Sequence, residues 1–123
     1  LDFGKELGSL ISSYDENLRV ALIASGGLSH QIVDEETDRF VLSCLASGDL
    51  ESMRNLSIER LNSAPGTPET LNWLTVAAAM GPVRMDLIDY LPCYRSLAST
   101  GHGVAFSEWR GNGQVLSATS RAQ

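Results

Sequence analysis

The spacing of apolar residues predicts three main helices. Apolar positions recur at near-helical intervals in residues 1–16, although two glycines weaken this helix. Asp34 is placed to cap a second helix over residues 35–46, which carries one apolar stripe. Thr67 is placed to cap a third, which has proline in its first turn and runs over residues 68–80 before a Gly-Pro pair.

Three other segments have the pattern of strands. Residues 19–25 form a nearly continuous apolar run with polar residues before it and two glycines after it, which predicts a strand buried on both faces. Residues 85–91 and 103–109 alternate between apolar and polar side chains, which predicts two further strands. We therefore expect an α/β fold with a mixed central sheet covered by helices.

Composition narrows the class of protein. The 123 residues suffice for one domain, and a net charge of -6 argues against nonspecific binding to nucleic acid or to an anionic membrane surface. No apolar run approaches the about 20 residues that cross a bilayer, and no signal peptide is recognisable. Cys44 and Cys93 lie far apart in no metal-binding pattern, so we expect a cytoplasmic protein. Residues 111–123 are rich in small and polar residues, which predicts a flexible tail.

His30 is the first candidate for chemistry. It follows the predicted strand 19–25 through Gly26 and Gly27, and open α/β sheets bind ligands beyond the carboxyl ends of their strands. An imidazole there can exchange protons near neutral pH. On local residues alone, however, a tight turn with a hydrogen-bonded loop histidine is the commoner arrangement.

Two further positions are weaker candidates. Glu69 lies in the first turn of the predicted third helix, where a favourable interaction with the helix dipole explains a carboxylate equally well. His102 lies between glycines just before a predicted strand, and two histidines so far apart in the sequence form no metal pattern. Trp73 is more simply a core residue. The charged stretch 34–39 is most simply a solvated helix start.

Familiar catalytic signatures are absent. The sequence contains no GxGxxG, GxxxxGK[ST], GxSxG or HExxH pattern, which leaves dinucleotide, P-loop, α/β-hydrolase and zincin functions without support from a motif.

An ordered set of short motifs instead gives the chain a family resemblance. The motifs are, in order, Gly26-Gly27-Leu28-Ser29-His30-Gln31, Asp38 with Phe40, Gly48-Asp49, and Glu69-Thr70-Leu71-Asn72-Trp73. Together they resemble the C-terminal half of a class III extradiol ring-cleavage dioxygenase, nearest to the catalytic subunit of the protocatechuate 4,5-dioxygenase type. The resemblance extends over residues 19–109. It implies that residues 1–110 are the C-terminal part of a catalytic domain.

The same resemblance implies that this domain is incomplete, and it implies a set of site residues. Members of this family hold a non-haem Fe(II) with two histidines and a glutamate, and a further histidine acts as acid and base on the substrate. By resemblance, Glu69 is an iron ligand and His30 is the acid-base residue. Ser99 and Thr100 fall where the family's loop approaches the substituent of the substrate ring.

The residue types suit that chemistry. Two imidazoles and one carboxylate leave open positions on Fe(II), at which a catecholate and O2 bind side by side. A neutral His30 can take a catechol proton and return it as the ring opens beside its diol. The resemblance therefore implies an oxidoreductase of aromatic-compound catabolism, acting on a catechol-type substrate.

The family's two iron-binding histidines belong to its N-terminal half, and nothing in this chain corresponds to that half. His102 cannot replace two ligands, and one carboxylate alone does not retain Fe(II). We therefore expect the chain to be a fragment, or one piece of an oligomeric enzyme. A missing N-terminal half or a companion subunit would supply both histidines, and the isolated chain would be inactive.

Two other functions stay open. The chain could be a noncatalytic structural or interaction subunit with the same fold and no metal, although the presence of both His30 and Glu69 argues against this. It could also be a small hydrolase that uses Ser29 and His30. Adjacent loop residues rarely point at each other, and no acidic partner is positioned by spacing, so the hydrolase is the weaker alternative.

Overall fold

The computed structural model describes residues 1–56, 58–62 and 67–111. Within them, helices pack against a small sheet, which confirms the α/β class. The elements are α1 (Asp2–Ser13), β1 (His30–Ile32), α2 (Glu35–Ser47), α3 (Ile58–Leu61), α4 (Thr70–Met80), β2 (Asp86–Tyr94) and β3 (Thr100–Glu108), with 3-10 turns at Glu51–Asn55 and Thr67–Glu69. The predicted flexible tail lies outside the described residues from position 112 onward.

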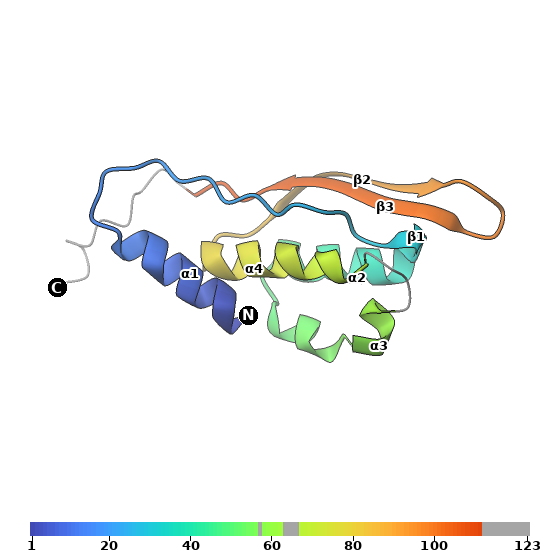
Figure 1. Cartoon of the computed structure of the whole chain (residues 1–123), viewed down its shortest axis with the longest axis horizontal. Coiled ribbons are helices and arrows are strands. Elements are labelled where there is room, and N and C mark those ends of the chain that lie inside the picture. Colours follow the sequence, from blue (N-terminus) through green and yellow to red (C-terminus); the bar gives the residue numbers. More distant parts are fainter. Residues whose placement is uncertain (57, 63–66, 112–123) are drawn as a thin grey trace.

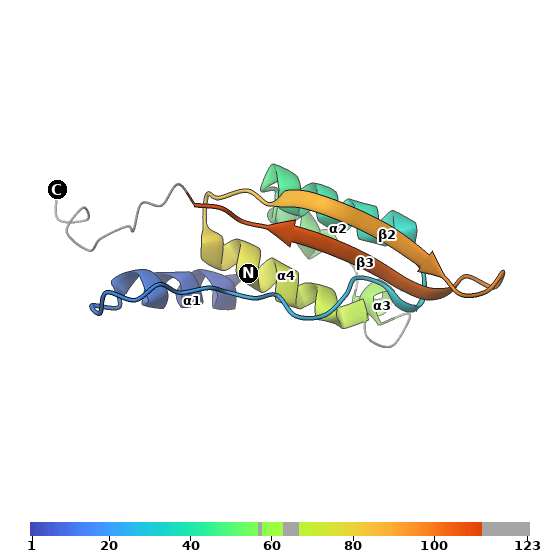
Figure 2. The same ribbon diagram turned by 90° about the horizontal axis from the view of Figure 1, so that it is seen from above.

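The described strands form one antiparallel sheet in the order β1-β3-β2. β2 and β3 make a hairpin, and β1 pairs with the other edge of β3, so that His30 lies opposite His102. The parallel pair that a mixed sheet requires is not among these strands. The helices lie on one side of the sheet (Figure 1), and a view from above shows β3 running between β2 and the segment that precedes β1 (Figure 2).

Local signals explain the ends of the helices. The Asp34 side chain accepts a hydrogen bond from the Thr37 amide at 3.0 Å, as predicted, and Gly48 ends α2 in the left-handed conformation. The start of α4, the third of the predicted helices, differs from the prediction. Residues 67–69 form a 3-10 turn, so Glu69 rather than Thr67 occupies the N-cap position of α4. No described helix has the length and apolar character needed to cross a membrane.

The two glycines of α1 place it close to α4. A Cβ atom at Gly4 would come within 2.5 Å of the carbonyl oxygen of Thr75, and one at Gly8 would overlap the backbone of Ala79. Tight packing of the two helices therefore offsets the low helix propensity of glycine. Because the glycine face contacts α4, Phe3 remains 73% exposed.

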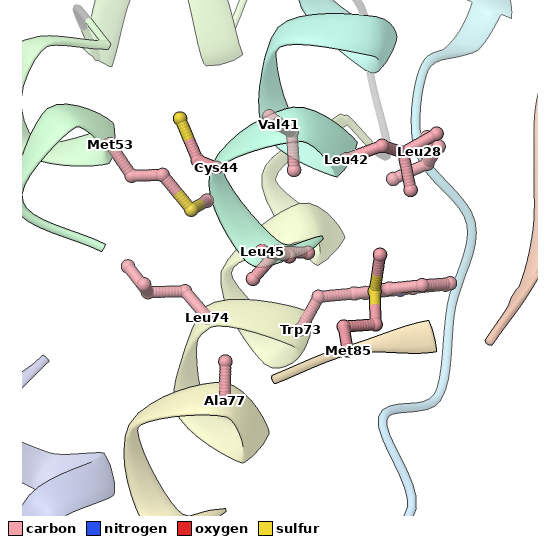
Figure 3. Close-up of a cluster of buried hydrophobic side chains, with 10 residues drawn as sticks. All are labelled: Leu28, Val41, Leu42, Cys44, Leu45, Met53, Trp73, Leu74, Ala77 and Met85. Atoms are coloured by element: carbon pink, nitrogen blue, oxygen red, sulfur yellow. The ribbon is translucent and has the colours of Figure 1, made fainter. Parts of the chain in front are cut away.

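The main apolar core lies between α2 and α4 (Figure 3). Leu28, just before β1, and Met85, just before β2, close it on the side of the sheet. Trp73 belongs to this core, as predicted. The buried members are Leu28, Val41, Leu42, Cys44, Leu45, Met53, Trp73, Leu74, Ala77 and Met85.

The prediction of a doubly buried strand at residues 19–25 is wrong. This segment has no strand pairing, and Ile23 is 84% exposed. It runs along β3 (Figures 1 and 2), but a cavity lined by both segments lies beside them. The described residues supply neither a hydrogen-bonded neighbour nor a covering layer for the outer face, and a buried strand requires both. The first strand forms later, at β1.

Replacing Leu45 by alanine tests the position of the core. Leu45 is 1% exposed, so the Leu45→Ala variant should lose about 2–5 kcal/mol of unfolding free energy in urea titrations, because it leaves a cavity between the helices. Leu71→Ala is the matched control, since Leu71 lies on α4 and is 47% exposed, and it should cost about 0.5 kcal/mol or less. Equal losses in the two variants would contradict this core.

Candidate functional site

His30 is held by one contact of its backbone and one contact of its ring. Its backbone N–H donates to Thr67 Oγ1 at 3.3 Å, and its Nδ1 lies 2.9 Å from the carbonyl oxygen of Leu28. Because a carbonyl oxygen can only accept, this contact requires the hydrogen to be on Nδ1. The other ring nitrogen, Nε2, then carries the lone pair in the neutral ring.

Glu69 approaches that free nitrogen. Its Oε2 lies 3.7 Å from His30 Nε2, although the two residues come from different elements. The start of α4 is tied to the loop before β1, because Asn72 Nδ2 donates to the carbonyl of Ser25 at 2.9 Å and Trp73 Nε1 donates to the carbonyl of Gly26 at 3.1 Å. The structure therefore brings together the two side chains that the sequence singled out.

Gly26 makes this approach possible. Its φ is +105°, a conformation that other residues rarely adopt, and a Cβ atom there would overlap the carboxylate of Glu69. At Gly27, a Cβ atom would lie 3.0 Å from His30 Cε1. The two glycines thus leave room for side chains of the site.

A second imidazole lies beside the first. The pairing of β1 with β3 sets His102 opposite His30, and the two ring centroids are 5.3 Å apart in an edge-to-face arrangement. Both rings line a cavity of about 910 Å³. Its other walls come from residues 20–24, from one face of α4, from β3 and from Trp109, which follows β3.

Comparison with known proteins identifies the family. Residues 1–100 match the family described as the catalytic LigB subunit of aromatic ring-opening dioxygenase. The chain belongs to this family. No curated protein and no solved structure matches the chain.

In this LigB-family chain, a buried carboxylate supports the loop that carries His30. Asp38 on α2 is 2% exposed. It accepts hydrogen bonds from the Ser29 amide at 2.8 Å, the Ser29 hydroxyl at 2.6 Å and the Tyr90 hydroxyl at 2.7 Å. Burial raises the pKa of Asp38, although these hydrogen bonds act in the opposite direction, and burial together with the bond to Asp38 raises the pKa of Tyr90.

The prediction that residues 34–39 are a solvated helix start is therefore wrong for Asp38. Helical periodicity places position 38 on the same face as Val41 and Leu45, which are core residues, and this spacing was a signal that could have located it. Thr67 and Tyr90 were also missed, because each acts through a contact between elements that are distant in the sequence.

The contacts of Ser29 do not favour a hydrolase. Its hydroxyl donates to Asp38 and accepts from the Asp34 amide at 3.1 Å, and the residue is 1% exposed. A nucleophile needs access to substrate and a base within hydrogen-bond reach. The hydroxyl of Ser29 is instead committed to holding the loop against α2.

Ser99 and Thr100 lie at the turn between β2 and β3. The carbonyl of Ser99 accepts from the Val33 amide at 2.8 Å, and Thr100 Oγ1 lies 2.7 Å from Ser96 Oγ. Neither residue is among those that line the cavity beside His30. The structure therefore does not bring them to the same place as His30 and Glu69.

The donor atoms suit one part of a metal site. Among the described residues, no three His, Cys, Asp or Glu side chains are grouped closely enough to hold a metal ion. The pair formed by His30 and Glu69 offers one carboxylate beside one imidazole. A two-histidine, one-carboxylate site therefore needs donors in addition to those grouped here.

Replacing Gly26 by alanine tests the close approach of Glu69. The Gly26→Ala variant should lose about 1–3 kcal/mol of unfolding free energy in urea titrations, because its backbone is strained and its methyl group meets the carboxylate. Gly81→Ala is the control, since Gly81 also has positive φ but a Cβ there meets nothing within 4 Å. A loss no greater than that of the control would contradict the contact.

The raised pKa of Asp38 predicts a pH-dependent stability. The folded chain keeps the Asp38 proton at pH values where the unfolded chain has released it, so this group's contribution to stability falls as the pH rises above the ordinary aspartate value of about 3.9. The asparagine of an Asp38→Asn variant does not titrate. As the pH rises from about 4 to about 7, the unfolding free energy of the wild type should therefore fall relative to that of the variant. An opposite trend in urea titrations would mean that the folded pKa is lowered.

Proposed function

We propose that this chain supplies the acid-base histidine and one metal-binding carboxylate of an Fe(II)-dependent extradiol dioxygenase, which opens catechol-type aromatic rings with O2. The observation that carries the proposal is the approach of His30 Nε2 to Glu69 Oε2 at 3.7 Å in a chain of this family. The two residues match the family's motif in the sequence, and the fold brings them to one place.

Glu69 is the proposed iron ligand of this chain. Its carboxylate is a hard anionic donor, and two histidines from a missing N-terminal half or a companion subunit would complete the coordination. Bound Fe(II) would supply the centre at which catechol and O2 are brought together and activated. Without those histidines, the isolated chain should be inactive.

His30 is the proposed acid-base residue. Its Nδ1–H is engaged by the carbonyl of Leu28, which leaves the Nε2 lone pair to accept a proton from a catechol hydroxyl. The same nitrogen can return the proton when the ring opens. The hydrogen bond at Nδ1 keeps the ring oriented through both transfers.

The cavity beside His30 is the proposed place of the aromatic substrate. Trp73 and Trp109 are both in its lining, and their ring centroids are 6.4 Å apart. Aromatic side chains of this kind can pack against a substrate ring. A substrate of the protocatechuate type is the finer proposal, and Ser99 and Thr100 would reach its ring substituent only if the substrate extends beyond the cavity that they do not line.

Exposed apolar surface supports a partner. The hairpin of β2 and β3 carries Ile88 and Phe106, which are 65% and 59% exposed, and the segment before β1 exposes Ile23. Large apolar side chains that are exposed in one chain can be covered at an interface with another. We propose that the missing half or companion subunit covers them in an oligomeric, cytoplasmic enzyme.

Substitutions in the assembled enzyme, with both halves present, separate the two roles. His30→Ala should lower the rate of ring opening by about 10²–10⁴-fold while iron stays bound, because only proton transfer is lost. Glu69→Ala should instead reduce the iron content, because a ligand is removed. Iron analysis and spectroscopic assays with catechol, protocatechuate and gallate measure both effects.

Phe40→Ala on the exposed side of α2 serves as a control, and it should keep both iron and activity. Equal loss of iron in His30→Ala and Glu69→Ala would contradict the assigned roles. An assembled wild-type protein that binds no iron and opens none of the three rings would favour the noncatalytic subunit.

A further inference from the structure

We infer that the buried carboxylate of Asp38 is a positioning residue for His30 and that it acts through the peptide group between Leu28 and Ser29. This inference rests on the proposed function only in treating His30 as the acid-base residue. The geometry itself involves neither a metal nor a substrate.

One peptide group connects the two side chains. Its N–H, which belongs to Ser29, donates to Asp38 Oδ1 at 2.8 Å, and its C=O, which belongs to Leu28, accepts from His30 Nδ1 at 2.9 Å. The carboxylate, the peptide and the imidazole therefore form a continuous chain of hydrogen bonds. Water is largely excluded from both the carboxylate and the peptide, because Leu28, Ser29 and Asp38 are all buried.

Hydrogen bonds in such a chain strengthen one another. A carboxylate that accepts from a peptide N–H polarises the peptide and makes its carbonyl oxygen a better acceptor, most effectively where water is excluded. The strengthened carbonyl favours the ring form with hydrogen on Nδ1. The lone pair is then held on Nε2, the nitrogen that faces Glu69.

The other bonds of Asp38 hold the carboxylate in place. Its Oδ2 accepts from the hydroxyls of Ser29 and Tyr90, which fix the carboxylate from the loop and from β2. On the side of β3 a Cβ atom at position 103 would overlap Oδ2, so Gly103 allows the strand to pass. Asp38 does not cap α2, since Asp34 does so. The Asp38 side chain therefore contacts the loop before β1 and not the backbone of its own helix.

The neighbours of the His30 ring do not provide the same effect. Glu69 faces Nε2, and an acceptor at that nitrogen would favour hydrogen there instead. His102 meets the ring edge to face, and Thr67 contacts the backbone N–H rather than the ring. The Leu28 carbonyl is therefore the contact that selects the Nδ1–H form, and Asp38 is the charged group behind it.

Nitrogen NMR of the full chain of 123 residues tests the inference directly. At about pH 8, where an ordinary histidine is neutral, the Nδ1 and Nε2 chemical shifts report which nitrogen carries the hydrogen. His30 should be mainly in the Nδ1–H form in the wild type. In Asp38→Asn, the ratio of the Nδ1–H form to the Nε2–H form should fall about threefold or more, because the charge behind the peptide is lost.

Tyr90→Phe is the matched control. It removes a hydrogen bond from the same carboxylate but leaves the Ser29 N–H bond, so it should lower the unfolding free energy without changing the ratio. Glu69→Gln should also retain the Nδ1–H form. A purely structural role of Asp38 would change stability in both Asp38→Asn and Tyr90→Phe and the ratio in neither.

Two results would overturn the inference: a wild-type His30 that is mainly in the Nε2–H form, or an Asp38→Asn ratio equal to that of Tyr90→Phe. If Asp38→Asn does not fold, the wild-type and Glu69→Gln spectra decide, because loss of the Nδ1–H form in either contradicts the arrangement. No iron or substrate is needed. An inactive assembled enzyme with the expected spectra would therefore count against the proposed function and not against this role of Asp38.

Discussion

The hydrogen bonds of the buried Asp38 carboxylate are the constraint on which the arrangement of the site depends. They join α2, the loop before β1 and β2 at a single group that is almost fully removed from solvent. Burying a carboxylate is costly unless its oxygens are hydrogen-bonded, and here three donors meet that need. The position of His30 follows from this, since Ser29 is the residue directly before it.

The same constraint explains why β3 carries a glycine where a side chain would be expected. Gly103 lies opposite Pro92 in β2 and next to His102, and a side chain there would displace the carboxylate. β3 therefore has no side chain at position 103, which leaves room for the Asp38 carboxylate to reach the loop before β1. The apolar core between α2 and α4 supplies the compensating stability.

Sequence patterns predicted the elements whose signals are local. The cap at Asp34 and the alternation of the two hairpin strands both depend on neighbouring residues, and the structure contains both features. The prediction of a buried strand at residues 19–25 failed, because burial on both faces depends on neighbours that the described residues do not supply. The motifs that contain His30 and Glu69 predicted two side chains that the fold brings together, but the approach of His102 depends on strand pairing, which no local pattern encodes.

The geometry of the pair also bears on how such a site handles charge. With hydrogen on Nδ1, the lone pair of His30 Nε2 and the carboxylate of Glu69 face each other at 3.7 Å, and a positive charge between or beside these two acceptors would stabilise the pair. A proton on Nε2 would supply this charge but would leave His30 unable to act as a base. A metal cation bound to Glu69, as proposed above, would supply it while His30 stays neutral. The arrangement of Asp38, the Leu28–Ser29 peptide and His30 would therefore keep a neutral base beside the carboxylate that we propose as the metal ligand.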